Sequence, residues 1–140
     1  MLTSTTLWGV FLGGCLGTAL RAGIGVALAA AQPTPAPTGA WATTLTVNVV
    51  GAVLLGLLMA RVRGRPMTPD WIQPTIAIGV LGSFTTYSAL AVDAAHLGRT
   101  SGLAFLIGFP LLNLLLGLTA VHVGLRLGRP RQRVTGDAPC

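Results

Sequence analysis

The sequence predicts an all-α integral membrane protein with four transmembrane helices. Hydrophobic residues make up 52% of the 140-residue chain and charged residues only 9%, and the mean hydropathy is +0.75. A soluble domain carries roughly 25% charged residues, so this chain has too few to cover its surface in water. It also contains four apolar stretches of about 20 residues or more, the length that a helix needs to cross a bilayer.

Each apolar stretch ends at residues that stop a helix or carry charge. A proline-rich segment at 32–39 follows the first stretch, and arginines follow the second, third and fourth. Since the connecting segments are short, we expect a single membrane domain, residues 1–140, with no appended soluble domain. The predicted helices span residues 7–30, 41–60, 71–97 and 102–125, and a polar basic tail follows at 127–140.

The charges predict an orientation in the cell membrane. All nine basic residues are arginine, and they lie at the ends of the apolar stretches rather than along a solvated face, which argues against nucleic-acid binding. At most Arg21 and Arg99 lie on the side opposite the termini. By the positive-inside rule, both termini are predicted to be cytoplasmic. Seven arginines share the side of the termini: Arg61, Arg63, Arg65, Arg126, Arg129, Arg131 and Arg133.

The reactive residues favour neither an enzyme nor a metal or disulfide framework. Cys15 and Cys140 lack metal-ligand spacing with the two histidines, and His96 and His122 lie near helix ends. The three acids are too few for a catalytic carboxylate pair. No basic segment precedes the first apolar stretch, so we expect no cleaved signal peptide.

Polar residues at membrane depth are costly and usually functional. They occur here as Asn48, Asn113, Arg21, Asp93 and a dense segment at 82–88. The glycine and hydroxyl residues of that segment favour a break in the third helix at the bilayer midplane, although an unbroken, glycine-rich packing helix is the alternative. The glycines of the other helices predict close helix packing. They are Gly13, Gly14, Gly17, Gly23, Gly51, Gly56, Gly108, Gly117 and Gly124.

Four motifs occur in order along the chain. They are Gly-Gly-Cys-Leu-Gly-Thr-Ala-Leu-Arg at 13–21, Thr-Leu-Thr-Val-Asn-Val-Val-Gly at 44–51, Gly-Val-Leu-Gly-Ser-Phe-Thr-Thr-Tyr-Ser at 79–88, and the spaced set Phe109, Asn113, Gly117 and Gly124. This pattern resembles the Fluc (CrcB) family of fluoride channels over nearly the whole chain.

The resemblance implies a dimer of oppositely oriented subunits that exports fluoride passively through two narrow pores and so reduces fluoride toxicity. It implies a structural sodium ion at the dimer interface, held by backbone carbonyls of Gly82 and Thr85. A larger side chain at Gly82 is expected to crowd that turn. The pore asparagine is matched by Asn48, whose uncharged amide we expect to donate to the anion, and the family's acid by Asp93. The hydroxyl lining falls at Thr86 and Ser88.

The sequence departs from the family at several pore positions. Tyr87 and Leu90 stand where the family has paired phenylalanines, Phe109 where it has tyrosine, and Asn113 where it has serine. A subunit that inserts both ways should have balanced arginines, and this chain does not. We therefore expect a heterodimer with a second Fluc-type subunit in preference to a homodimer.

Two other functions fit a small membrane bundle. A four-helix drug or cation exporter requires an acidic residue in its first helix, which this chain lacks. A non-transporting membrane assembly protein explains the glycines but not the ordered polar motifs.

Overall fold

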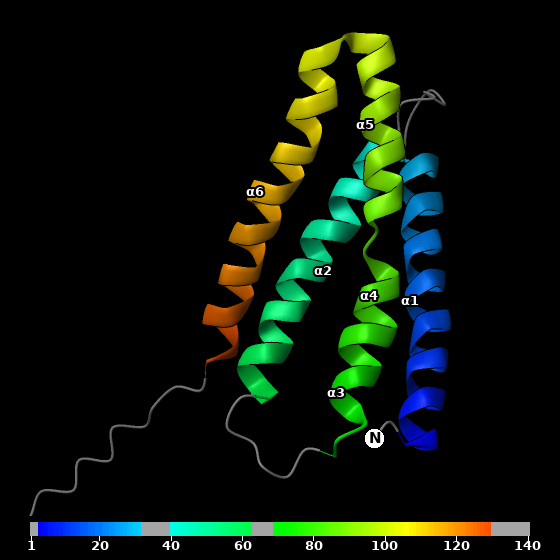
Figure 1. The fold of residues 1–140 in the computed structure, drawn as a ribbon, viewed down its shortest axis with the longest axis vertical. Coiled ribbons are helices and arrows are strands. Elements are labelled where there is room, and N and C mark those ends of the chain that lie inside the picture. Colours follow the sequence, from blue (N-terminus) through cyan, green and yellow to red (C-terminus); the bar gives the residue numbers. More distant parts are fainter. Residues whose placement is uncertain (1–2, 32–39, 63–68, 130–140) are drawn as a thin grey trace, which may run out of the picture.

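The computed structural model describes residues 3–31, 40–62 and 69–129, and within them all regular structure is helical. Four long helical segments run roughly along one direction (Figure 1). The first, second and fourth segments are single helices, α1 (Ser4–Ala30), α2 (Ala40–Val62) and α6 (Leu103–Gly128). The third segment is composite, and in chain order it consists of α3 (Ile72–Pro74), the π-helical η1 (Thr75–Leu81), α4 (Gly82–Phe84) and α5 (Tyr87–Ser101).

All four segments are long and apolar enough to cross a membrane. They contain 27, 23, 30 and 26 residues, and about 20 suffice to span the hydrocarbon core. The predicted all-α class with four candidate membrane spans is therefore confirmed.

The observed helix ends differ from the expected ones by a few residues. The first helix begins at Ser4 because the Thr3 hydroxyl oxygen accepts the N–H of Thr6 at 3.3 Å and caps it. The last helix continues to Gly128, so the first residues assigned to the basic tail belong to α6. The rest of that tail, residues 130–140, lies outside the described residues.

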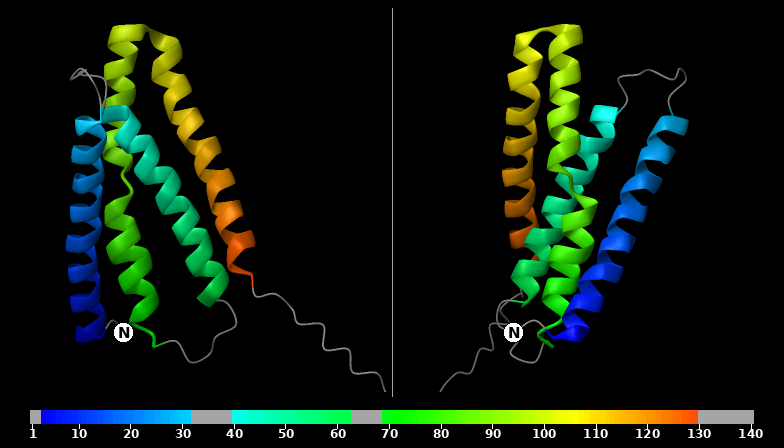
Figure 2. Two further views of the ribbon diagram at one scale, coloured as in Figure 1. Left: turned by 180° about the vertical axis from the view of Figure 1, so that it is seen from behind. Right: turned by 45° about the vertical axis from the view of Figure 1, so that its right-hand side comes forward.

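A single residue, Gly102, joins α5 to α6. Its φ of 99° lies in the region that side-chain-bearing L residues rarely adopt, and its N–H donates to the Gly98 carbonyl at 3.1 Å. The chain reverses direction within this turn, so α5 and α6 lie beside each other as an antiparallel pair (Figure 2).

Glycines set the distance between α2 and α6, which pack along each other. A Cβ atom on Gly56 would collide with the Val121 carbonyl oxygen, and one on Gly124 would collide with the Val53 carbonyl oxygen. The two backbones approach this closely only because neither glycine carries a side chain.

A second glycine contact joins α1 to the third segment. A Cβ on Gly13 would lie 2.7 Å from the Thr75 carbonyl oxygen, and one on Gly17 would collide with the Val80 carbonyl oxygen. Packing is thus confirmed for several predicted glycines. A Cβ on each of three others meets nothing within 4 Å among the described residues, namely Gly23, Gly108 and Gly117.

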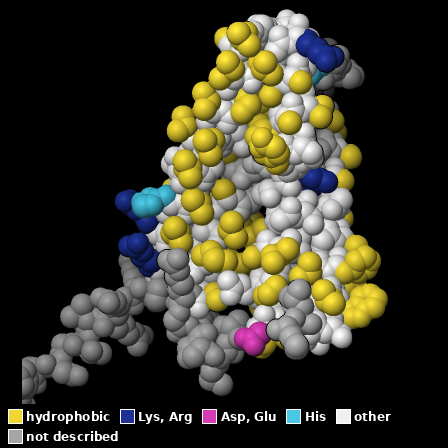
Figure 3. Space-filling model, viewed as in Figure 1, with side chains coloured by type: hydrophobic (Ala, Val, Ile, Leu, Met, Phe, Trp, Pro, Cys, Tyr) yellow, Lys and Arg dark blue, Asp and Glu magenta, His cyan; other side chains and the backbone are white. Residues whose placement is uncertain are grey.

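Most large apolar side chains lie on the outside of the bundle. Trp8 is 66% exposed and Leu115 63%, and apolar side chains are spread along the face shown in Figure 3. Exposing this much apolar surface to water is unfavourable, whereas lipid chains are as apolar as leucine side chains. The surface therefore suits a bilayer.

We predict that Gly124→Ala destabilises the bundle and that Gly117→Ala, on the same helix, does not. The added methyl group at Gly124 meets the Val53 backbone, and overpacking of this kind costs about 1–3 kcal/mol. The measurement is the melting temperature of each variant in detergent, followed by size-exclusion chromatography. Equal melting temperatures would contradict the assigned α2–α6 contact.

Candidate functional site

Helical backbone stops at Phe84 and resumes at Tyr87. Between them Thr85 (φ −78°, ψ 160°) and Thr86 (φ −150°, ψ 126°) are extended. Thirteen residues of the 72–101 segment precede these two threonines and fifteen follow them. Extended backbone in a membrane span leaves N–H and C=O groups that need partners from the protein, because lipid offers none.

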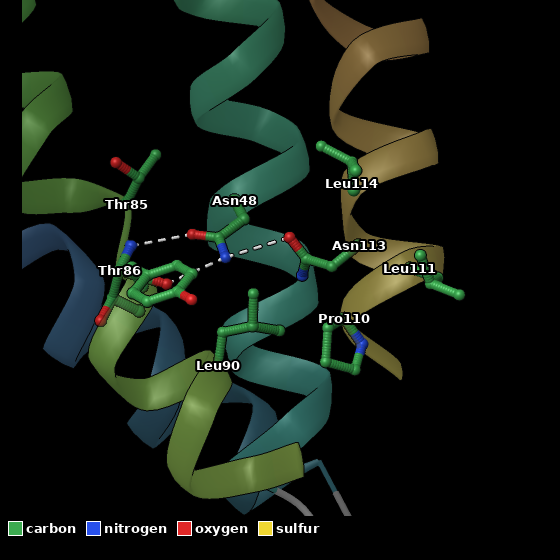
Figure 4. A pocket seen from close by; sticks show the side chains of 9 residues that line it. Asn48, Thr85, Thr86, Leu90, Pro110, Leu111, Asn113 and Leu114 are labelled. Atoms are coloured by element: carbon green, nitrogen blue, oxygen red, sulfur yellow. Dashed lines mark hydrogen bonds between the residues drawn. The ribbon is translucent and has the colours of Figure 1, made fainter. Parts of the chain in front are cut away.

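Asn48 of α2 supplies those partners to Thr86. Its Oδ1 accepts the Thr86 N–H at 2.8 Å, and its Nδ2 donates to the Thr86 carbonyl oxygen at 3.1 Å. One side-chain amide thus pairs with both backbone groups of one residue (Figure 4). Thr86 is only 8% exposed, so water does not supply hydrogen-bond partners to its backbone, and Asn48 provides them instead.

The same arrangement frees two backbone carbonyls. In an unbroken helix the Gly82 carbonyl would accept the Thr86 N–H, and the Thr85 carbonyl would accept the N–H of Ala89. Here the Thr86 N–H donates to Asn48, and the Ala89 N–H donates to the Thr86 hydroxyl oxygen at 3.2 Å. The Gly82 and Thr85 carbonyls therefore have no helical donor.

The turn at Gly82 is more open than expected. A Cβ on Gly82 meets only the Ala77 carbonyl oxygen, at 3.6 Å, which is ordinary contact. A methyl group at Gly82 is therefore accommodated within the described part of the subunit, and the expected crowding by a side chain larger than alanine stays a prediction. Gly82 is exposed, so the space beyond it is available to another molecule.

Asn48 also contacts Asn113 of α6. Its Nδ2 donates to Asn113 Oδ1 at 3.3 Å. An amide nitrogen carries two hydrogens, and both the Thr86 carbonyl oxygen and Asn113 Oδ1 lie within hydrogen-bond distance of Asn48 Nδ2. The expectation that the Asn48 amide donates to an anion stays a prediction. The Nδ2 of Asn113 is buried and has no hydrogen-bond partner among the described residues.

These residues surround a cavity of about 450 Å³ between α2, the interruption and α6. Two predicted pore residues at the phenylalanine positions, Tyr87 and Leu90, also line it. Tyr87 is 83% exposed, so its ring lies at the outer surface of the subunit, whereas Leu90 is buried. Sequence reasoning missed Pro110, which lines the same cavity from α6 and lies three residues before Asn113.

A second cavity of about 380 Å³ lies on the α1 side of the interruption. Arg21, Asp93 and Ser88 line it, and Thr86 lines both cavities. The Thr44 hydroxyl donates to Asp93 Oδ2 at 2.6 Å. The role of Thr44 was missed, although its position one helical turn before Asn48 places both side chains on one face of α2.

Phe109 lies apart from both cavities. It is 7% exposed, packs against Leu90 and Ala94, and meets the ring of Trp41 edge-on at 6.4 Å between centroids. It lines a third, apolar cavity of about 490 Å³ together with Leu97. The structure therefore brings Asn48, Thr86, Tyr87, Leu90 and Asn113 together, but not Phe109.

A family model described as CrcB-like protein, Camphor Resistance (CrcB), matches residues 8–125. The fluoride-specific ion channel FluC of Paracoccus denitrificans is 39% identical over 121 residues, which cover 86% of this chain and 91% of that protein. FluC of Deinococcus radiodurans is 40% identical over 124 residues, with 87% and 93% covered. FluC 1 of Mycolicibacterium paratuberculosis is 36% identical over 120 residues, with 86% and 87% covered.

The matched region includes the second and third candidate spans in full, most of the first and fourth, and the residues around the interruption at Thr85 and Thr86. Relatives of 36–40% identity cover more than four fifths of the chain. The protein belongs to the CrcB-like family.

Proposed function

We propose that this protein is a subunit of a fluoride-selective channel that lets fluoride leave the cell passively and so lowers its cytoplasmic concentration. The observation that carries the proposal is the match over residues 8–125 to a family whose relatives are named fluoride-specific ion channels. The polar groups around the interruption support it, because they lie in the membrane-spanning part of the chain.

The chemistry of the two cavities suits a small anion. Fluoride holds its water tightly, so a pore must replace that water with donors and still release the ion. The lining offers amide and hydroxyl groups and, at Tyr87, an electropositive ring edge. The proposed pore residues are Asn48, Thr86, Tyr87, Ser88, Leu90, Phe109 and Asn113, with Phe109 supporting the wall from behind Leu90.

Transport, rather than catalysis, is the activity of such a channel. The drug-exporter alternative still lacks its acid, since α1 contains no Asp or Glu. A purely structural assembly role does not explain the buried Asn113 amide nitrogen, which has no hydrogen-bond partner within the described part of the chain.

The interruption at Thr85 and Thr86 lies at the bilayer midplane in this proposal. Its central place in the 72–101 segment supports that depth.

The carbonyls of Gly82 and Thr85 hold a structural sodium ion between two subunits. Oxygen atoms are the ligands that hard cations prefer, and unwound carbonyls at midplane are a known way to bind sodium. The missing helical donors and the open face at Gly82 support this assignment.

The working channel is an antiparallel pair of this chain with a homologous subunit of opposite orientation. The helix ends support a fixed orientation. Arg61 lies in the last turn of α2, and Arg126 and Arg129 lie at the end of α6. Both helix ends are on the same side of the bundle as the start of α1 (Figure 1). Arg99 lies at the opposite end, on α5. Arg63, Arg65, Arg131 and Arg133 lie outside the described residues.

The test of the channel function is fluoride efflux from liposomes, measured with a fluoride electrode and with chloride as the control ion. We expect rapid fluoride efflux and no comparable chloride efflux, since the lining carries uncharged donors fitted to a small anion. Expression in cells without a fluoride exporter should restore fluoride resistance. Folded, membrane-inserted protein that conducts no fluoride, alone or with its partner, would refute the function.

Gly82→Ala tests the proposed subunit contact. Because a Cβ at Gly82 fits within the subunit, we expect the variant to fold and insert normally. It should nevertheless lose dimer assembly, fluoride flux or both, since the added methyl group enters the space assigned to the ion and partner. Cross-linking in membranes measures assembly, and Gly23→Ala, in open space on α1, is the matched control. Normal dimers and flux would contradict the placement of this contact.

Reporter fusions at the C-terminus test the orientation. We expect signal from a cytoplasmic reporter and none from an external one, because the arginines lie mostly on the side of the termini. Comparable signals from both reporters would mean dual topology, and a homodimer would then be the working form.

A further inference from the structure

We propose that the end of α6 binds the headgroup of an anionic phospholipid through His122, Arg126 and Arg129. The inference starts from a stripe of exposed side chains on α6, which changes from apolar to basic as it runs toward the end of the helix. It uses the depth in the bilayer proposed above for the interruption, but it does not depend on what the pore conducts.

Six exposed side chains of α6 form this lipid stripe. They follow one another at intervals of three or four residues, which is the spacing of neighbours on one face of a helix. Gly124, which contacts α2, lies two residues from both His122 and Arg126, and residues two apart point to nearly opposite sides of a helix. The stripe therefore faces away from α2. Its members are Leu111, Leu115, Leu118, His122, Arg126 and Arg129.

The change from leucine to basic residues falls at the depth of the membrane interface. Measured along α6 from Asn113, which lies beside the interruption, His122 is about 14 Å away and Arg126 about 20 Å. With the interruption at the midplane, the hydrocarbon core ends at about 15 Å and the headgroup layer at about 20–22 Å. The exposed Trp8 and Trp71, of a residue type that favours membrane interfaces, lie at the same end of the bundle (Figure 1).

The charge at the end of α6 is positive. Arg61 adds to it from α2, because it follows Ala60, and a Cβ on Gly128 of α6 would lie 2.5 Å from the Ala60 Cβ. The acids of the described residues lie elsewhere, since Asp70 precedes α3, which packs on α1, and Asp93 lies on α5. Figure 3 shows arginine and histidine side chains gathered over the end of α6. An anion is therefore the complementary ligand.

An anionic phospholipid matches both parts of the lipid stripe. Its acyl chains lie along the leucines, and its phosphate lies at the depth of the guanidinium groups, which bind phosphate oxygens in a bidentate manner. The imidazole N–H of His122, nearer the hydrocarbon core, can donate to the same headgroup. A soluble anion would use only the basic part. A protein surface would have to compensate the desolvation of the arginines with its own carboxylates.

Lipid binding to the purified channel, with its partner subunit if one is needed, is the direct test. Native mass spectrometry counts bound phosphatidylglycerol and phosphatidylcholine with the same acyl chains. We expect tighter binding of phosphatidylglycerol, a rise of the melting temperature with that lipid alone, and a weaker effect at high salt. Equal binding of the two lipids would overturn the proposal. An equal rise with inorganic phosphate would rule out a lipid as the ligand.

Arg126→Gln locates the site. Because each arginine near a charged headgroup contributes modestly, we expect the variant to bind phosphatidylglycerol about fivefold more weakly, and Arg126→Lys to lose less. Arg99→Gln is the matched control, since Arg99 is also exposed but lies on α5 at the opposite end of the bundle. Equal losses in Arg126→Gln and Arg99→Gln would overturn the assignment to α6. Lipid binding is counted without fluoride, so a channel that conducts none would leave this result standing.

A spin label at Leu118 tests whether lipid covers the stripe. The label is attached to a Leu118→Cys variant in which Cys15 and Cys140 are replaced by alanine. In bilayers we expect strong relaxation by oxygen, which dissolves in the hydrocarbon core, and weak relaxation by a water-soluble nickel complex. A label shielded from both would mean that another subunit covers the stripe, and the lipid site would be refuted.

Discussion

A membrane segment that leaves the helical path must find partners for its backbone within the protein, and the rest of this structure is arranged around that constraint. Two extended threonines interrupt the third span, and a single amide on α2 pairs with the N–H and the carbonyl of the second one. The bond lengths of 2.8 and 3.1 Å leave little freedom in the distance between α2 and the interruption. The freed carbonyls and the orientation of the second asparagine both follow from this pairing.

The glycine contacts make the pairing possible. Asn48 is a short side chain, so α2 must lie close to the interruption, and α6 must lie close to α2 for Asn113 to reach it. Gly51 of α2 faces the Thr85 and Phe84 side chains, and Gly56 and Gly124 let α2 and α6 approach backbone to backbone. The glycines thus allow the short distances between the helices, and these distances let the polar side chains form hydrogen bonds with one another.

The sequence predicts the parts of this structure that depend on local pattern. Apolar length marks the four spans, and the run of glycine and hydroxyl residues marks the segment where the extended threonines lie. Asn48 and Asn113 stand out because polar side chains are rare at that depth. The direction of each hydrogen bond between them depends on three elements meeting in space, and no local pattern contains it. The same limit applies to Phe109, which packs in an apolar cluster, and to Gly82, whose open face depends on what α1 and α2 leave uncovered.

The one-residue link at Gly102 has a consequence for the arrangement of the spans in a membrane. Two spans joined by one residue form a helical hairpin, so neither can lie far from the other in a membrane. The third span is the less apolar of the two and carries Asp93, while α6 is rich in leucine. The turn therefore ties the interrupted span directly to the most apolar of the four candidate spans, which is also the helix that supplies Asn113.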